Sequence, residues 1–226
     1  MDIKKIRIAL DGPSGAGKST IAKRVAEKLG LVYVDTGALY RTVGLYSIEN
    51  GIASDDSDAI VASLEKIKIE LTYENGAQKV YLNGSDVGNK IRTPQASLYA
   101  AAVSKLPPVR AFLLDLQRNL AGKGGVIMDG RDIGTVIMPD AELKVFMTAT
   151  PEARAKRRCL ELEEKGMPQA YEDVLADIIA RDKSDSERET SPCRPADDAE
   201  YFVNDEYGIE ESADYIINLA HSRANA

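Results

Sequence analysis

The stretch of the chain that is richest in potential chemistry is a glycine-rich octapeptide near the N-terminus. Residues 12–19 read Gly-Pro-Ser-Gly-Ala-Gly-Lys-Ser, which fits the pattern G-x-x-x-x-G-K-[ST]. In this pattern backbone N–H groups curve around a phosphate, the lysine reaches the outer phosphates of a nucleotide, and the final hydroxyl binds Mg²⁺. The octapeptide follows a β-rich run and opens a helix-periodic segment, which is where a phosphate loop must lie. The sequence therefore predicts a nucleotide-phosphate site that uses Lys18 and Ser19.

An acidic residue ends a second apolar run. Residues 126–128 are Val-Ile-Met, and Asp129 follows directly. Ligands of open α/β sheets bind at the carboxyl ends of strands, so Asp129 is predicted to lie beside the Mg²⁺ and its waters. An ordinary aspartate at a strand-to-loop junction is the alternative.

Arginines recur at helical spacing in the second half of the chain. Arg154, Arg157 and Arg158 stand at i, i+3 and i+4, and share a helix face that could close over a phosphoryl group in transfer. The alternative is a solvated face paired with Glu161. Residues 166–168, Gly-Met-Pro, would suit a lid that opens and closes.

Further basic residues indicate a second anionic substrate. Arg181, Asp185 and Arg188 recur at i, i+4 and i+7, which predicts one helical face, although a surface row of ion pairs has the same spacing. Three single arginines stand near predicted element ends: Arg41, Arg110 and Arg131.

Composition excludes several classes of protein. The chain has 226 residues and a net charge of -7, which disfavours a surface that coats nucleic acid. Its two cysteines have no metal-type spacing and its one histidine lies near the C-terminus, so a zinc site, a disulfide framework and histidine-based catalysis are disfavoured. No run approaches the length of a membrane span, and we expect a cytoplasmic protein.

The elements that must position these residues alternate between strand and helix. Apolar runs at 6–10, 31–34, 126–128, 143–148 and 201–204 predict strands, and helix-periodic segments are predicted at 18–29, 36–50, 94–104, 107–121, 151–165, 171–187 and 209–223. Thr36 is the expected cap of the second helix. Residues 67–93 predict an inserted antiparallel hairpin with a turn at 74–76. The expected fold is a parallel sheet covered by helices on both faces.

Two other nucleotide-dependent classes fit less well. A GTP switch needs Asn-Lys-x-Asp, and residues 89–92 read Asn-Lys-Ile-Arg instead. A motor normally takes an arginine from another subunit and has a longer chain. A kinase for another small acceptor and a non-catalytic nucleotide-binding module stay open.

Six strings together resemble the bacterial cytidylate kinase family over about residues 6–215. They are residues 12–19, 35–41 (Asp-Thr-Gly-Ala-Leu-Tyr-Arg), 91–93, 107–110, 129–136 (Asp-Gly-Arg-Asp-Ile-Gly-Thr-Val) and the Arg181–Arg188 pattern. The resemblance implies an adenylate-kinase-like P-loop fold, with a core at about 1–60, 104–150 and 190–226. It also implies a nucleoside-monophosphate-binding insert at about 61–103 and a lid at about 151–170.

The resemblance further implies the reaction ATP + CMP ⇌ ADP + CDP with Mg²⁺, in a monomer that also accepts dCMP and uses UMP poorly. No nucleic acid polymer or membrane is implied as a partner. The catalytic residues carried over are Lys18, Arg131, Arg154, Arg157 and Arg158. The ATP phosphates are assigned to Gly12, Pro13, Ser14, Gly15, Ala16, Gly17, Lys18, Ser19 and Thr20, with Mg²⁺ on Ser19 and, through water, Asp129.

For CMP, the resemblance implies that Arg41 and Arg131 hold the phosphate. Around the base and ribose it places Thr36, Arg110, Asp132, Arg181, Asp185 and Arg188. The family commonly has serine at the position of Thr36, which keeps the hydroxyl. It commonly has a hydroxyl residue at the position of Ala101, near the ribose, so discrimination between ribose and deoxyribose is the expected point of difference.

Overall fold

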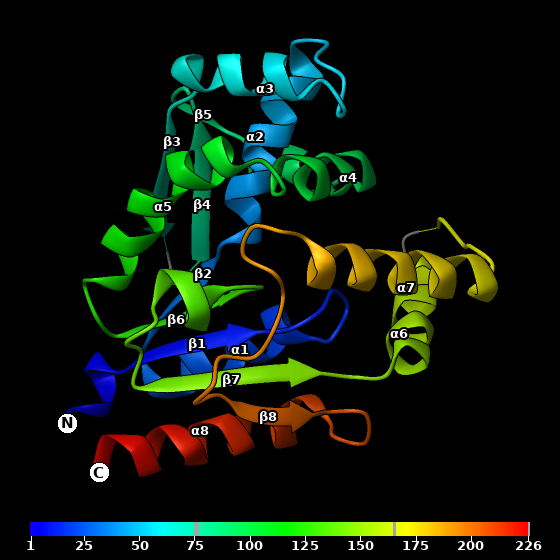
Figure 1. Cartoon of the computed structure of the whole chain (residues 1–226). Helices are drawn as coiled ribbons and strands as arrows, with labels where there is room; N and C mark the ends of the chain where they lie inside the picture. Colours follow the sequence, from blue (N-terminus) through cyan, green and yellow to red (C-terminus); the bar gives the residue numbers. More distant parts are fainter. Residues whose placement is uncertain (75–76, 165, 226) are drawn as a thin grey trace. The chain divides into compact units, whose positions relative to one another are not determined.

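The computed structural model describes residues 1–74, 77–164 and 166–225, and the larger of its two sheets has five strands (Figure 1). The strand order is β2-β6-β1-β7-β8. The pairings of β1 with β6, of β1 with β7 and of β7 with β8 are parallel. The strands are β1 Arg7–Asp11, β2 Val32–Asp35, β6 Val126–Gly130, β7 Leu143–Thr148 and β8 Glu200–Val203. The predicted parallel sheet flanked by helices is confirmed.

Residues 1–32 and 124–226 form one compact unit. Its helices are α1 Lys18–Leu29, α6 Pro151–Glu164, α7 Tyr171–Glu187 and α8 Ile209–Asn225. Helix α1 packs against α8 and against β6, while α6 packs against α7 (Figure 1). The central strands β1, β6 and β7 are mostly apolar because both of their faces are covered, and Ile8, Leu10, Ile127 and Met128 have no exposed surface.

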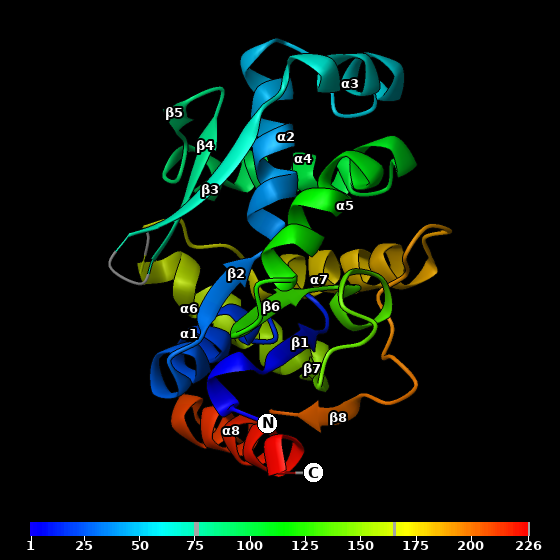
Figure 2. The ribbon, with the colours of Figure 1, turned by 90° about the vertical axis from the view of Figure 1, so that its left-hand side faces the viewer.

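Residues 33–123 form a second compact unit. It contains helices α2 Gly37–Glu49, α3 Ser57–Ser63, α4 Pro94–Val103 and α5 Pro107–Ala121, and strands β3 Ile69–Glu74, β4 Ala77–Leu82 and β5 Ser85–Asp86. The three strands form an antiparallel sheet in the order β3-β4-β5, and α2 packs against α4 and β4 (Figure 2). Buried Leu39, Val43, Ile60 and Val80 belong to one hydrophobic core.

The predicted hairpin is confirmed, with Ile69 opposite Leu82 and Leu71 opposite Val80. Asn75 and Gly76 of the predicted turn lie outside the described residues, as does Lys165 at the end of the predicted helix 151–165. Helix α3 lies outside the predicted elements. The predicted insert at 61–103 and lid at 151–170 stay predictions.

Within the described ranges no helix is long and apolar enough to cross a membrane.

Candidate active site

The glycine-rich loop joins β1 to α1, and at Gly12, Gly15 and Gly17 its backbone has a positive φ, which favours glycine. Gly12 has φ +144°, and a Cβ there would lie 1.9 Å from the carbonyl oxygen of Met147. Gly17, with φ +88°, is the N-cap of α1, so the helix begins directly at Lys18. Because the partial positive charge of a helix dipole is at its N-terminus, the loop and helix form an anion site of the predicted kind.

Lys18 is buried inside this loop. Only 5% of the residue is exposed, and its Nζ donates to the carbonyl oxygen of Pro13 at 2.6 Å. Burial, and then the positive charge of Arg131, hold the pKa of Lys18 below its usual range, although Asp129 and Asp11 act in the opposite direction. In this environment, an anion that reaches the loop stabilises the charged lysine.

We expect ATP binding to be accompanied by proton uptake at Lys18. A lowered pKa means that part of the lysine is neutral between that pKa and the ordinary value, and a neighbouring polyphosphate restores the charged form. Calorimetric titrations with MgATP at mildly alkaline pH, in buffers of different ionisation enthalpy, measure this uptake. Lys18→Met is the control and should bind without it. Identical binding enthalpies for the wild type in all buffers would contradict the expectation.

Ser19 and Asp129 lie together at the start of α1 and the end of β6. The Ser19 hydroxyl donates to Asp129 Oδ2 at 2.5 Å, and Asp129 is 5% exposed. A hydroxyl and a carboxylate oxygen side by side suit Mg²⁺, which takes few protein ligands and keeps waters and phosphate oxygens. Among the residues that the structure describes, no three His, Cys, Asp or Glu side chains form a metal cluster.

The three arginines of α6 have different partners. Arg154 is 2% exposed, donates to the carbonyl oxygen of Ser14 at 3.0 Å and forms an ion pair with Asp182 of α7. Arg154 therefore lies against the phosphate loop, and its charge is buried and paired. A cavity of about 170 Å³ next to it is lined by Pro13, Phe146, Thr148, Arg154, Asp182, Asp185, Ser186 and Cys193.

Arg157 and Arg158 point elsewhere. The Arg157 guanidinium donates to the backbone carbonyl of Asn204 at 2.9 Å and to its side-chain oxygen at 3.3 Å. Arg158 pairs with Glu161 at 3.0 Å and its side chain is 40% exposed. Arg154 thus bonds directly to the loop, whereas Arg157 bonds to Asn204, whose side-chain N–H donates to the carbonyl oxygen of Ala16 in the loop at 3.0 Å.

A buried cluster of charges follows β6. Arg131 Nε donates to Asp185 Oδ2 of α7 at 3.0 Å, and Asp132 Oδ1 lies 3.9 Å from Arg188 Nη2. The side chains of Asp132 and Arg188 are 7% and 6% exposed. The structure thus brings Arg131, Asp132, Asp185 and Arg188 together in one unit.

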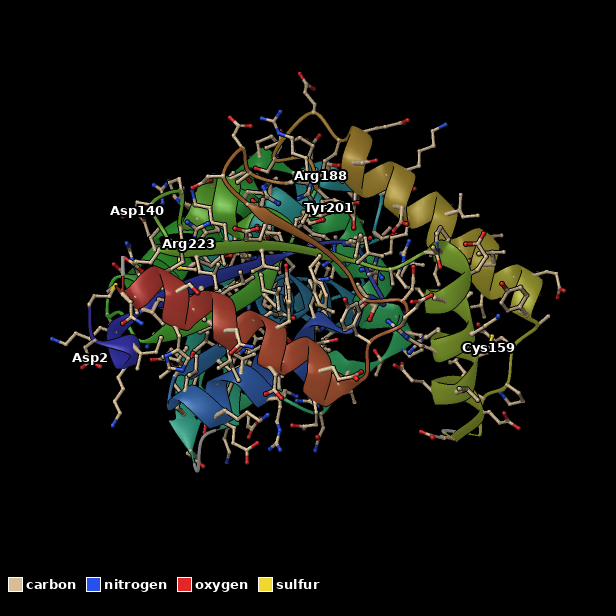
Figure 3. All side chains as sticks on the ribbon, turned by 90° about the horizontal axis from the view of Figure 1, so that it is seen from below. Asp2, Asp140, Cys159, Arg188, Tyr201 and Arg223 are labelled. Atoms are coloured by element: carbon tan, nitrogen blue, oxygen red, sulfur yellow. The ribbon has the colours of Figure 1, made fainter. Side chains whose placement is uncertain are left out.

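The predicted helical face with Arg181, Asp185 and Arg188 is wrong in its last member. Helix α7 ends at Glu187, and Arg188 is extended, with φ -64° and ψ 139°. Its Nε donates to the carbonyl oxygen of Ser191, and it lies in the segment that leads to β8 (Figure 3). Arg181 and Asp185 are on α7, with Arg181 half-buried.

In the second unit, Arg41 is held by a carboxylate. Arg41 Nη2 lies 2.5 Å from Asp35 Oδ2, while Asp35 Oδ1 accepts the N–H of Ala38 at 3.0 Å. The expected place of Thr36 at the start of the helix is confirmed, but the expected capping by its side chain is wrong. Thr36 stands at the N-cap, but its side chain makes no capping hydrogen bond, and the residue before it supplies the acceptor. Thr36 itself is 3% exposed.

Arg110 is also buried in the second unit. It donates to the carbonyl oxygen of Ser104 at 3.2 Å, and its guanidinium carbon lies 5.5 Å from the centroid of the Tyr40 ring. Stacking on an aromatic face orients the guanidinium plane.

Four residues with site contacts were not singled out from the sequence. Asp11 is the last residue of β1, and Asn204 directly follows β8. Because ligands bind at the carboxyl ends of such strands, these positions could have marked both residues as site candidates. Asp182, the partner of Arg154, belongs to the Arg181–Arg188 pattern, but no role was assigned to it there. Gln78 accepts the N–H of Asp35 at 2.8 Å and donates to its carbonyl oxygen at 3.3 Å, a pairing across 43 residues without a local signal.

The sheet order, the phosphate loop after β1 and the arginine-bearing helices α6 and α7 define a P-loop kinase of the adenylate-kinase-like class. The family model described as cytidylate kinase matches residues 8–222. The chain belongs to the cytidylate kinase family.

Relatives cover nearly the whole chain. A cytidylate kinase of Caldicellulosiruptor saccharolyticus is 49% identical over 217 residues, 96% of each chain. One from Thermosipho melanesiensis is 46% identical over 217 residues, 96% of this chain and 97% of the relative. An uncharacterized protein from Eubacterium ventriosum shares the fold, with a TM-score of 0.51 at 12% identity, over 96% of this chain and 99% of that one.

Proposed function

We propose that this protein transfers the terminal phosphoryl group of ATP to CMP, and to dCMP, giving ADP and CDP or dCDP. One observation carries the proposal: within a single unit, β6 delivers Asp129 to Ser19 of the phosphate loop and, directly afterwards, Arg131 and Asp132 to a buried charged cluster. A donor-phosphate site and a second polar site thus share one strand end. The similarity to cytidylate kinases supports cytosine as the base.

The donor half would hold ATP by its phosphates. Backbone N–H groups of residues 14–20, which include the first turn of α1, would bind the phosphate oxygens, and Lys18 and Arg154 would neutralise charge on the group in transfer. Ser19 and, through water, Asp129 would hold Mg²⁺, which when bound would supply further neutralisation of the phosphate charge. Arg157 and Arg158 are the remaining lid arginines of the proposal.

The acceptor half would aim the CMP phosphate. Arg41 and Arg131 are assigned to that phosphate. In this structure, Arg41 pairs with Asp35 and Arg131 pairs with Asp185. These pairs keep the guanidinium groups oriented until the phosphate arrives, which lowers the cost of ordering two long side chains. Phosphoryl transfer needs little covalent work from the protein, so in-line positioning is the main contribution.

The base would be read by the charged groups around Asp132. The exocyclic N4 amine of cytosine is a donor, which a carboxylate accepts, whereas uracil presents an acceptor oxygen at that position. A buried carboxylate facing that oxygen is repelled, which is the physical reason to expect poor use of UMP. Arg188, Arg110 and Thr36 are assigned to the same base, and Arg181 and Asp185 to the ribose.

An assay of ADP formation from ATP tests the proposal. CMP, dCMP, UMP, AMP and shikimate are offered as acceptors in parallel. Preferred turnover of CMP is the expected result. Turnover with AMP or shikimate alone would favour a kinase for another small acceptor, and ATP binding with no turnover would favour a non-catalytic module; either result overturns the proposal. A monomeric state and a cytoplasmic location remain part of the proposal.

We expect Ala101→Ser to raise the preference for CMP over dCMP by about two- to twelvefold, the worth of one neutral hydrogen bond. Ala101 is partly buried on α4, and its serine neighbours already donate to backbone carbonyls, Ser97 to Thr93 and Ser104 to Ala101, each at 3.1 Å. The measurement is the ratio of kcat/KM for CMP over dCMP. Ala102→Ser, one position further along the helix, is the matched control. An unchanged ratio in Ala101→Ser would show that this position does not read the sugar.

A further inference from the structure

The buried aspartate that ends β1 caps a turn far away in the sequence. Asp11 is 4% exposed, and its Oδ1 and Oδ2 accept the backbone N–H groups of Ile133 and Gly134, each at 2.7 Å. These two N–H groups open a π-helical turn at Ile133–Ile137, which begins directly after Asp132. The phosphate loop begins on the other side, with Gly12. One carboxylate therefore connects the donor loop to the segment that carries Arg131 and Asp132.

Asp132 occupies the position from which an aspartate ordinarily caps its own helical turn. A side-chain oxygen at that N-cap normally accepts an N–H two or three residues later. Asp132 makes no such capping bond, and its Oδ1 lies 3.9 Å from Arg188 Nη2 instead. The cap comes from Asp11, 122 residues away from Ile133. The carboxylate of Asp132 is thereby directed to the charged cluster rather than to its own turn.

The fit between Asp11 and the turn leaves no spare room. A Cβ at Gly134 would lie 3.3 Å from Asp11 Oδ2 and 3.2 Å from Lys144 Cδ, closer than most real Cβ contacts. The β1–β6 register places Asp11 beside Gly130, the residue before Arg131. Burial raises the pKa of Asp11 to about 7, even though the hydrogen bonds from the two N–H groups act to lower it. These two hydrogen bonds therefore help to keep the Asp11 carboxylate charged.

We propose that Asp11 is a positioning residue for acceptor recognition: by capping the 133–137 turn in place of Asp132, it fixes Asp132 and Arg131 for the incoming nucleoside monophosphate. The inference rests on the proposed function in assigning those two residues to CMP. It predicts that damage to Asp11 weakens CMP binding selectively. If Asp11 had only a structural role, its replacement would lower stability and leave the ratio of the CMP and MgATP affinities unchanged.

The test is Asp11→Asn, an isosteric change that replaces one acceptor with an N–H donor facing another N–H. We expect the dissociation constant for CMP to rise by about ten- to hundredfold, the range for a lost charged hydrogen bond, while that for MgATP changes less than threefold. The matched control is Glu142→Gln. Glu142 accepts the N–H of Arg7 at 2.8 Å, at the opposite end of the same strand β1, so this variant tests a similar loss without touching the turn. It should keep both affinities.

A second variant approaches the same contact from the turn. Gly134→Ala places a methyl group against Asp11 Oδ2, and we expect the same selective loss of CMP affinity. In the double variant with Asp11→Asn, the loss of CMP binding free energy should be smaller than the sum of the losses in the two single variants, because both act on one contact. This variant decides the question if Asp11→Asn fails to fold. Amide hydrogen exchange of residues 132–137 should be faster in both variants and unchanged in Glu142→Gln.

The outcomes separate the two proposals. If the wild type neither binds nor phosphorylates CMP, the proposed function fails, and with it the acceptor role of Asp11, whatever the exchange rates. If the wild type is a CMP kinase but the variants lose CMP and ATP affinity equally, or keep CMP affinity while losing stability, the positioning role alone is overturned. Selective loss of CMP affinity with faster exchange in the turn supports it.

Discussion

Replacing Lys18 with methionine should remove nearly all phosphoryl transfer and leave the fold intact. The ammonium is the only lysine charge inside the phosphate loop, where it donates to Pro13, and its partner during transfer would be the outer phosphates of ATP. Charge stabilisation of this kind is worth about a hundred- to thousandfold in turnover when one donor is removed. Methionine has a similar length and carries no charge, so kcat falls without a cavity being opened in the loop.

The stability of Lys18→Met should not fall with its activity. Because burial lowers the pKa of Lys18, the charged form is disfavoured in the free protein, and removing it costs little or stabilises the fold. Thermal unfolding should therefore give a Tm equal to or above that of the wild type. Lys28→Met is the matched control on the same helix: Lys28 forms ion pairs with Glu210 and Asp214 at the surface and should retain full turnover. More than a tenth of wild-type turnover in Lys18→Met would contradict the catalytic assignment.

Alanine at Asp132 or at Arg188 should damage the use of CMP far more than the binding of ATP. Both side chains are almost fully buried and lie 3.9 Å apart, so removing either leaves the other charge without its neighbour and deprives the base of a partner. Loss of one charged hydrogen bond weakens binding by about ten- to hundredfold. The affinities for CMP and MgATP, measured separately by titration calorimetry, give the comparison.

Asp132→Asn refines this test, since the amide keeps the size of the side chain but replaces one acceptor with a donor. We expect it to lose CMP affinity and to narrow the difference between CMP and UMP, because an amide donor suits the oxygen of uracil. The matched controls are Glu200→Ala and Arg223→Ala, which break an exposed ion pair at 2.8 Å and should change neither affinity. Equal losses for CMP and ATP in Asp132→Ala would place Asp132 outside the base pocket.

The course of the chain follows from its sequence in most places. Helices α1, α5 and α7 have the predicted bounds, because their apolar residues recur with helical period between clear boundaries such as Gly17, Gly30 and Pro107. The central strands β1, β6 and β7 were recognisable as continuous apolar runs, since both of their faces are buried. The short α3 was not predicted: seven residues give too few turns for a periodic pattern, and its main local signal is the capping Asp56.

The partners of the polar residues were decided by the tertiary structure. The glycines, Lys18 and Ser19 of the phosphate loop are fixed by local backbone geometry, so their spacing in sequence was sufficient to place the loop. Arg154, Arg157 and Arg158 share a face of α6, yet α7 supplies Asp182 as the partner of Arg154, the residue after β8, Asn204, is the partner of Arg157, and Arg158 pairs with Glu161 on α6 itself.

The two corrections are local in sequence, unlike Asp11. Asp35 and Thr36 are adjacent and can both accept an N–H of the first turn of α2, and it is Asp35 that does so. At Arg188 the backbone is extended because α7 ends at Glu187. Asp11 reaches Ile133 only because β1 and β6 pair in parallel register across more than a hundred residues. Local sequence determines which backbone groups of a turn need a partner, and only the assembled sheet determines which side chain supplies it.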